Sequence, residues 1–440
     1  MRRAAIVMPM RTPVGLPGGA LAAVSPNRLV GTVLSAVLGR SGIDPKRVEQ
    51  LVTAVPDFDA IRPSLARCGL SPELGDFAVG TGSGGGLRAL VAAAMMVRTG
   101  AADVVLAVGS EYPCAADSFD AQPASVPRFS APRPGPGNPA GPSTDEQIAL
   151  WAAEPPRGQA ESLLTEQLAH DHGLDRAVAD DFAAASHRRA ARAHRQGVFG
   201  AEIAPVVVCS RPDDPSSDVV RLVDRDEGLR DDVSPRAFAA LSPFRSGGVS
   251  TAANCSTRGL AASACLVVAE DRLVDLGLEP LGYLTDWVSA AAAAGTTAPA
   301  ATSAVAKALW RNGVGLTELE LLEVEETSAV EVLAVARTLG LVSHTGGLAD
   351  AAGDRLNVHG GSIALGDPGG AAGLRMVTTM MHELARRDGS LGLAVTPTGA
   401  GRALAAVFES PDRTPVSEAP RGARFRGAGG RRSGRGRHRP

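Results

Sequence analysis

The sequence NVHGGSIALGDPGGAAG at residues 357–373 is the most specific signal of the fold in this 440-residue chain. Its glycines lead into an apolar-periodic segment, which predicts a tight turn followed by a helix. The glycine-rich residues 82–86 have the same arrangement. They follow a short extended run at 76–81 and precede apolar residues at helical spacing, namely Leu87, Leu90, Val91, Ala94 and Met95. Both halves of the chain therefore contain a unit of strand, glycine turn and helix.

Strands and helices alternate along the whole chain. In the first half, AAIVMPM at 4–10 and DVVLAVG at 103–109 predict buried strands, and residues 26–41 predict a helix. Continuous apolar runs of this kind are typical of strands covered by helices on both faces. The second half repeats the pattern, with apolar runs at Ala261–Ala269, Leu321–Val324, 392–395 and 403–408. The alternation predicts an α/β fold with two similar layers.

Composition places the chain among ordinary globular proteins. A hydrophobic content of 44% provides for core-sized domains, and an aromatic content of only 3% favours close-packed helices and tight turns. No segment has the apolar length of a membrane span. The five cysteines form no metal-ligand spacing, so they are expected to be buried thiols in a reducing cytoplasm, and no metal is expected. The cysteines are Cys68, Cys114, Cys209, Cys255 and Cys265.

The last twenty residues differ from the rest. Residues 421–440 hold eight arginines and no acidic residue, although the whole chain has a net charge of −3. Such a glycine- and arginine-rich segment cannot bury a core, so residues 411–440 are expected to be a disordered tail. It is either a solvated extension or a weak binder of nucleic acid, and nucleic acid is not otherwise expected as a partner.

Several segments resemble the thiolase superfamily in the same order along the chain. Residues 357–373 resemble its NxNGGxIALGHPxGASG pattern. The other matching segments are RTPVG at 11–15, GGGLRA at 84–89, SHRRAARAHRQGVFGAEIAPV at 186–206, STAANCS at 250–256 and GRALAAVFE at 401–409. The resemblance implies two duplicated βαβαβαββ halves in five layers (α/β/α/β/α), in a homodimer. It places the first half at 1–275, with an inserted loop domain at about 120–245, and the second half at 276–410.

The resemblance also implies that four catalytic positions have changed. Ser83 stands where the family has its nucleophilic cysteine, and Asp367 stands where it has the histidine of GHP. Pro397 occupies the position of the second cysteine, and Glu325 replaces an asparagine, while Glu326 keeps an acidic position. Because serine is a weak nucleophile without a base and proline cannot titrate, ordinary thiolase activity is not expected.

The remaining candidates leave alternatives open. Ser83 is either an acyl acceptor on a glycine turn or a helix N-cap. Asp367 and Glu325 are either a paired acid and base or solvated acids in an idle cleft. His359 is either a replacement base or a hydrogen-bonded loop residue.

A substrate channel follows from the same resemblance. Asn254, Ser256 and Gly399 match family positions that bind the substrate, although asparagine and serine also suit turns. The substrate implied is an acyl thioester, as acyl-CoA or on a carrier protein, with no cofactor beyond the coenzyme A thioester. The leading hypothesis is therefore a thiolase-like acyltransferase. The alternatives are a non-catalytic thiolase-like partner protein, or a carbon–carbon lyase or condensing enzyme that uses the acidic residues.

Overall fold

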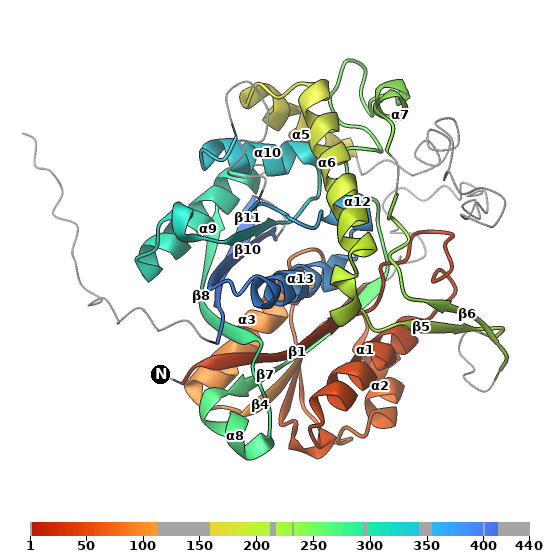
Figure 1. Ribbon diagram of the computed structural model, residues 1–440, viewed down its shortest axis with the longest axis vertical. Coiled ribbons are helices and arrows are strands. Elements are labelled where there is room, and N and C mark those ends of the chain that lie inside the picture. Colours follow the sequence, from red (N-terminus) through yellow and green to blue (C-terminus); the bar gives the residue numbers. More distant parts are fainter. Residues whose placement is uncertain are drawn as a thin grey trace, which may run out of the picture.

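A computed structural model describes residues 2–111, 159–211, 217–230, 233–293, 297–342, 354–398 and 401–411. Nine strands form one mixed sheet in the order β3-β2-β4-β7-β1-β8-β11-β10-β9. Five of these strands come from the first half of the chain and four from the second (Figure 1). The order of strands within each half follows the same rule.

The first half-sheet has the order β3-β2-β4-β7-β1. β2 pairs in parallel with β3 and β4, whereas β7 pairs antiparallel with both β4 and β1. The strands are β1 (Ala4–Arg11), β2 (Gln50–Ala54), β3 (Asp76–Ala78), β4 (Val104–Glu111) and β7 (Ala261–Ala269), and the helices are α1 (Pro26–Ser41), α2 (Phe58–Arg67) and α3 (Gly85–Thr99).

The second half-sheet repeats this arrangement in the order β9-β10-β11-β8. β9 and β10 are parallel, and β11 is antiparallel to β10 and β8. A parallel bridge from Leu322 to Leu356 takes the place that β3 has beside β2. The strands are β8 (Gly282–Ala291), β9 (Leu321–Val324), β10 (Leu391–Pro397) and β11 (Arg402–Glu409), and the helices are α9 (Thr297–Asn312), α10 (Ala329–Thr338) and α13 (Ala372–Arg386).

The helices and half-sheets form five layers. One apolar cluster joins α1 and α2 to the outer face of the first half-sheet, and another joins α9 and α10 to the second. A third lies between the half-sheets, where α3 and α13 pack against each other (Figure 1). The predicted α/β fold with two similar halves is therefore confirmed.

The two half-sheets are not separate sheets, because β1 and β8 pair with each other. Ala4–Ile6 of β1 pair antiparallel with Gly282–Leu284 of β8, so the halves share one continuous sheet. β1 and β8 are the corresponding first strands of the two halves. Each would otherwise be an open edge, and pairing them satisfies their backbone groups. The residue bounds given above for the two domains stay a prediction.

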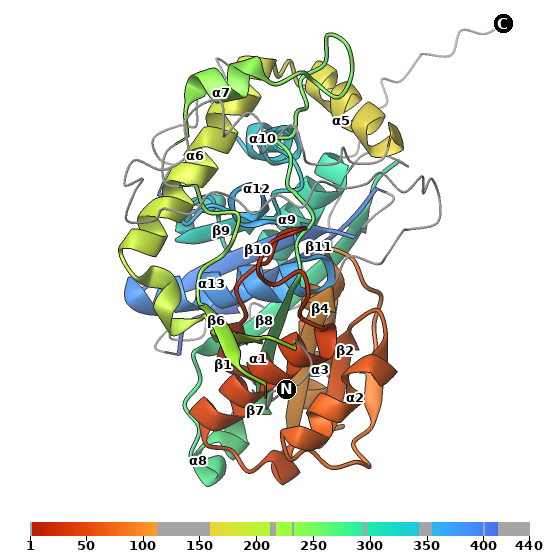
Figure 2. The ribbon, with the colours of Figure 1, turned by 90° about the vertical axis from the view of Figure 1, so that its right-hand side faces the viewer.

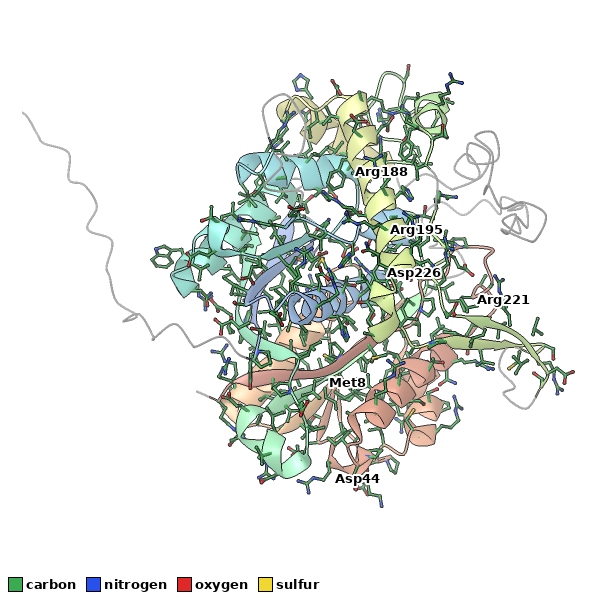
Figure 3. All side chains as sticks on the ribbon, viewed as in Figure 1. Met8, Asp44, Arg188, Arg195, Arg221 and Asp226 are labelled. Atoms are coloured by element: carbon green, nitrogen blue, oxygen red, sulfur yellow. The ribbon has the colours of Figure 1, made fainter. Side chains whose placement is uncertain are left out.

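The segment between β4 and β7 covers one side of the second half. Figure 2 shows α5, α6 and α7 over α10 and α12. The elements are α5 (Gln159–Asp171), α6 (Arg176–Arg195), β5 (Val206–Cys209), β6 (Val219–Val223) and α7 (Pro235–Ala240), followed later in the chain by α8 (Leu273–Leu276) and α12 (Ser362–Leu365). β5 and β6 form a separate hairpin that carries Arg221 away from the body, and the chain then returns to Asp226 (Figure 3). Of the predicted insertion at about 120–245, residues 120–158, 212–216 and 231–232 lie outside the described residues.

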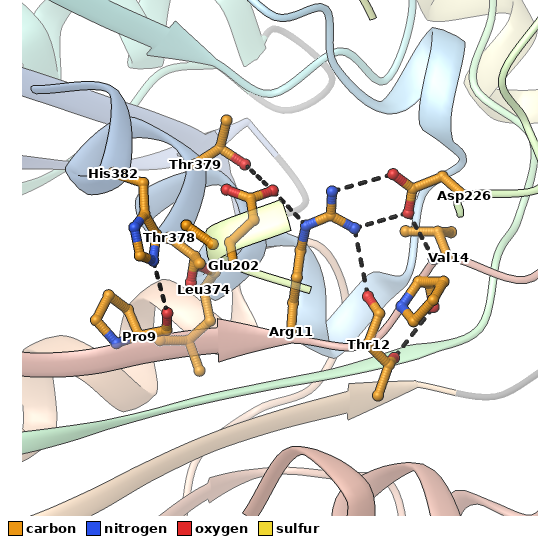
Figure 4. A network of polar contacts seen from close by, with 12 residues as sticks. Pro9, Arg11, Thr12, Val14, Glu202, Asp226, Leu374, Thr378, Thr379 and His382 are labelled. Carbon is orange, nitrogen blue, oxygen red and sulfur yellow. Dashed lines mark hydrogen bonds and ion pairs between the residues drawn. The ribbon is translucent and has the colours of Figure 1, made fainter. Parts of the chain in front are cut away.

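A buried ion network fastens this segment to the core. The fully buried Arg11 at the end of β1 donates from Nε to Glu202 Oε1 at 2.6 Å. Its Nη1 and Nη2 donate to the two carboxylate oxygens of Asp226 at 2.7 and 3.0 Å (Figure 4). Thr379 of α13 donates to the same Glu202 oxygen at 3.1 Å. Because a bidentate arginine–carboxylate pair fixes geometry as well as charge, the network holds the insertion against β1 and α13.

Within the part of the chain that the structure describes, no helix has the length and apolar character needed to cross a bilayer. The predicted disordered tail falls almost wholly on residues 412–440, which lie outside the described residues.

Candidate functional site

A glycine turn places Ser83 at the entrance of α3. Gly82 has φ +82°, a conformation that side-chain-bearing residues rarely adopt. A Cβ on Gly84 would lie 2.6 Å from Thr398 Cγ2 and 3.0 Å from the carbonyl oxygen of Pro397. The start of α3 therefore packs directly against the end of β10, which brings the Pro397 carbonyl against Gly84, the residue after Ser83. The N-cap position of α3, Gly84, provides no side-chain hydrogen bond, so Ser83 is not its N-cap.

Asp367 is held rigidly opposite this turn. Its backbone N–H donates to the Thr257 carbonyl and its carbonyl accepts from Gly259 N, each at 2.8 Å. Its side chain is turned by a hydrogen bond from Gly369 N to Oδ1, at 2.9 Å. The other carboxylate oxygen, Oδ2, accepts a hydrogen bond from Ser83 Oγ at 3.3 Å. The structure therefore joins two predicted site residues as a hydroxyl donor and a carboxylate acceptor.

Glu325 lies behind this pair. Its backbone N–H donates to the Val395 carbonyl at 3.0 Å, and its side chain is buried, with Oε1 accepting from the Ser362 hydroxyl. Burial raises the pKa of Glu325 to about 7; the charge of Arg375 opposes this rise, and the charge of Asp367 adds to it. Glu325 is therefore close enough to Asp367 for their charges to interact. Near neutral pH, the protonated and the ionised form of Glu325 are both populated.

The cluster around Glu325 contains two residues that sequence patterns did not single out, Glu323 and Arg375. Burial raises the pKa of Glu323 to about 8 and also raises that of Glu326. The neighbouring Arg375 of α13 is 2% exposed. An arginine in the otherwise apolar GLRMV at 373–377 was the available signal, but sequence alone does not say that its guanidinium faces these carboxyls.

His359 does not join Ser83. It is 3% exposed, and its Nε2 lies 2.8 Å from Glu383 Oε2 on α13, with the ring edge against Phe199. Burial alone would raise the pKa of Glu383, but hydrogen bonds from His359 and Arg386 hold it well below its usual range. His359 therefore pairs with Glu383, which matches the alternative of a hydrogen-bonded loop histidine.

Asn254 and Ser256 take part in loop hydrogen bonding. Asn254 is 1% exposed; its Nδ2 donates to Asp180 at 2.8 Å and to the Val249 carbonyl at 2.9 Å. Ser256 is 4% exposed and donates to the Thr327 carbonyl at 3.2 Å. These contacts match the turn alternative. Substrate binding by the two residues stays a prediction, and Gly399 lies outside the described residues.

An open cavity of about 400 Å³ is lined by Gln196, Gly197, Val198, Ala201, His382 and Arg386 and contains none of the predicted site residues. Among the described residues, no group of histidine, cysteine, aspartate and glutamate side chains has an arrangement that could hold a metal ion.

Comparison with known proteins identifies the family. The family described as thiolase, N-terminal domain, matches residues 4–271, and that described as thiolase, C-terminal domain, matches residues 278–410. The chain belongs to the thiolase family. An acetyl-CoA acetyltransferase of Chromobacterium violaceum is 32% identical over 421 residues, covering 92% of this chain and 99% of that protein. One of Pseudomonas aeruginosa is 33% identical over 413 residues, covering 92% and 98%.

Solved structures agree with this assignment. The human mitochondrial 3-ketoacyl-CoA thiolase is 25% identical and superposes with a TM-score of 0.75, covering 93% of this chain and 99% of that one. The same human protein in complex with CoA superposes equally well. In this thiolase-family chain, the groups that come together at the centre of the fold are a serine hydroxyl, an aspartate and a buried glutamate. Such a set can move a proton and take up an acyl group.

Proposed function

We propose that this thiolase-family protein is an acyltransferase that acts on an acyl thioester, with Ser83 as the acyl acceptor and Asp367 as its base. The observation that carries the proposal is the hydrogen bond from Ser83 Oγ to Asp367 Oδ2 at 3.3 Å. A serine becomes a useful nucleophile only when a base takes its proton, and a nucleophile hydrogen-bonded to an oriented base is the arrangement required. Gly369 N provides the orienting contact to the base.

The reaction divides into two acyl transfers. Ser83 Oγ attacks the thioester carbonyl carbon, and its proton passes to the Asp367 carboxylate. The carbon–sulfur bond then breaks, and the departing thiolate takes the proton from Asp367. This leaves an ester on Ser83 and a free thiol. A second nucleophile, an alcohol, an amine or water, then attacks the ester, gives its proton to Asp367 and receives the acyl group, while Ser83 regains a proton.

The N-terminus of α3 stabilises negative charge that develops next to Ser83. α3 is a 15-residue helix whose N-cap residue, Gly84, makes no side-chain hydrogen bond. The N-terminus of such a helix has a partial positive charge from backbone N–H groups without intrahelical partners. An acyl carbonyl oxygen on Ser83 would become negative in the tetrahedral intermediate, so its formation close to this helix end is favourable.

Coenzyme A thioesters are the substrate class that we infer. The relatives above are named acetyl-CoA acetyltransferases, and one structural neighbour was solved with CoA. A thioester on a carrier protein presents the same acyl group and sulfur. Acetyl-CoA is therefore the first substrate to test, and longer acyl-CoA molecules are the second.

A second candidate function is carbon–carbon bond cleavage or condensation without an acyl-enzyme. The specific observation in its favour is the buried carboxyl of Glu325, which interacts with the charge of Asp367. Burial raises the pKa of Glu325 to about 7, and the charge of Arg375 opposes this rise. A buried carboxyl that titrates near neutral pH can give or accept a proton beside a second carboxyl. A Ser83→Ala variant that keeps full turnover while Glu325→Gln loses it would favour this function. A non-catalytic partner role would leave both variants equal to the wild type.

Thiolysis of 3-ketoacyl-CoA is expected to be absent at ordinary enzymatic rates. The resemblance places proline at position 397, where the family has its second cysteine, and proline has no proton to exchange in the Claisen step. The test is acetoacetyl-CoA cleavage by the full chain, followed by loss of absorbance, with an acetyl-CoA acetyltransferase as the positive control. Turnover at about 1 s⁻¹ or more would contradict the assignment of Pro397.

The protein is also expected to be a homodimer. β3 is the edge strand of the large sheet, all three of its residues are exposed, and Phe77 is 50% exposed. An open edge with an exposed aromatic ring favours pairing with another copy, because pairing satisfies backbone groups and covers apolar area. Light scattering of the full chain should give twice the 44.8 kDa chain mass. A single-chain mass at micromolar concentration would contradict the expected dimer.

A further inference from the structure

We propose that Arg375 is a positioning residue for this site: its buried guanidinium is the counter-charge that fixes how many protons the carboxyls at residues 323–326 hold. We call these residues, Glu323 to Glu326, the glutamate segment. The inference rests on the proposed function for its role in acyl transfer, but its charge balance can be tested without any substrate.

Arg375 is in an unusual environment for an arginine. It is 2% exposed on α13, and two of its nitrogens, Nε and Nη1, have no hydrogen-bond partner among the described residues. α13 packs against β9, the strand that leads into the glutamate segment. A buried guanidinium is costly unless opposite charges surround it. The charges that interact favourably with it are the carboxyls of the glutamate segment, whose pKa values it lowers.

The glutamate segment supplies more negative charge than one arginine can balance. Each of its three carboxyls is 2% exposed or less. The charge of Arg375 opposes the upward pKa shift of all three. The charge of Arg189 on α6 also interacts with Glu323 and Glu326, and its Nη1 donates to the Leu356 carbonyl at 3.0 Å. Because three buried carboxylates would leave uncompensated charge, at least one of these carboxyls retains a proton at neutral pH.

Hydrogen bonds show which carboxyl is best suited to be the anion. Glu326 accepts from Ser186 at 2.7 Å, from Asn357 at 2.9 Å and from the Ile363 N–H at 3.3 Å. Three donors stabilise its carboxylate form. Glu325 accepts only from Ser362, and its Oε2 has no partner among the described residues. Glu325 is therefore the better proton holder of the two.

Arg375 determines the pH at which Glu325 loses its proton, because its charge lowers the pKa of Glu325. The groups that act on the charge of Glu325 are Arg375 from α13, Asp367 from the loop before α13, Ser362 from α12 and Glu326 from its own segment. Of these, only Arg375 is a cation. With Arg375 present, Glu325 titrates near neutral pH. Without it, Glu325 stays protonated to higher pH and no longer changes its charge beside Asp367 in the physiological range.

Stability as a function of pH tests the charge balance directly. A carboxyl whose folded pKa is raised stabilises the fold fully below its unfolded pKa, and this contribution is lost as pH rises through the folded pKa. In the wild type the loss should end near the pKa values of Glu325 and Glu323, about 7 and about 8. In Arg375→Met, whose folded values lie higher, the loss should continue to higher pH.

The expected result is a stability deficit of Arg375→Met that grows between pH 5 and pH 9. A loss of one pKa unit of charge interaction corresponds to about a tenfold change in the unfolding equilibrium constant. Arg375→Lys keeps the cation and should show a deficit that hardly changes with pH. Arg375→Met combined with Glu325→Gln should lose part of the pH dependence, because glutamine does not titrate. Urea unfolding at constant ionic strength measures all four proteins.

A deficit of equal size at pH 5 and pH 9 would mean that Arg375 acts only through packing, and would overturn the proposal. If Arg375→Met does not fold at any pH, adding Glu323→Gln and Glu325→Gln should restore folding, and a failure to do so would also overturn it. The acyl-transfer role has a separate readout, the pH profile of acylation, whose pH-dependent limb should move upward by about one unit in Arg375→Met. If the wild type is never acylated, the proposed function fails while the stability experiment still decides the role of Arg375.

Discussion

Ser83→Ala is expected to lower the rate of acyl-enzyme formation from acetyl-CoA by on the order of a thousand-fold or more. The substitution removes one oxygen from a glycine turn, and that oxygen donates the 3.3 Å hydrogen bond to Asp367. The N-cap residue of α3 is Gly84, so the substitution removes no cap from the helix. The fold should therefore survive, and the lost rate should reflect the lost nucleophile. Release of free CoA thiol, followed with a thiol reagent, measures it.

Two variants make this result specific. Ser83→Cys should be acylated faster than the wild type if the helix end favours an anion, because a thiolate is the better nucleophile. Ser25→Ala is a matched control: Ser25 is the N-cap of α1, where its side chain accepts from Arg28 N. It should cost about 1 kcal/mol of stability and leave acylation unchanged. Equal CoA release by the wild type and Ser83→Ala would contradict the role of Ser83.

Asp367→Asn is expected to slow acylation by roughly 10²–10⁴-fold, the usual contribution of a positioned general base. Asparagine has the same shape, and its oxygen can still accept from Gly369 N, as Asp367 Oδ1 does at 2.9 Å. It cannot take the Ser83 proton. The loss should be smaller in a Ser83→Cys background, because a thiol ionises without help far more readily than a hydroxyl. Stopped-flow measurement of CoA release gives both rates.

A surface aspartate provides the matched control for this variant. Asp175 is the N-cap of α6, where its side chain accepts from Val178 N at 2.9 Å. Asp175→Asn keeps that acceptor and should leave acylation unchanged. If Asp367→Asn acylates Ser83 as fast as Asp175→Asn does, Asp367 is not the base, and Glu325 becomes the carboxyl to test next.

Much of the fold could be predicted because it depends on local patterns. Apolar strands such as Ala261–Ala269 and the glycine turns before α3 and α13 carry their signal in a few neighbouring residues. The pairing of β1 with β8 could not be predicted in this way. It joins residues 4–6 to residues 282–284, and neither segment carries a local feature that names its partner.

The positions of some site residues could be predicted from the sequence, but the directions of their side chains could not. The resemblance put Ser83 and Asp367 at matching positions, and the structure joins them by a hydrogen bond. His359 could be assigned to the right loop, but the direction of its ring depends on Glu383, which lies 24 residues further along the chain. Arg375 was missed because a charged residue in an apolar helix is normally expected to reach solvent. Only tertiary packing reveals that it is buried instead, where its charge lowers the pKa values of three buried carboxyls.

Peptide mapping after incubation with acetyl-CoA tests the acyl-serine most directly. The full chain is incubated with acetyl-CoA, stopped in acid to preserve the ester, digested and analysed by tandem mass spectrometry, beside Ser83→Ala and Ser83→Cys. The predicted result is one acetylated peptide whose fragment ions place the acetyl group on Ser83, its absence in Ser83→Ala, and a thioester on residue 83 in Ser83→Cys. If neither the wild type nor Ser83→Cys takes up an acyl group from acetyl-CoA or longer acyl-CoA molecules, Ser83 is not an acyl acceptor.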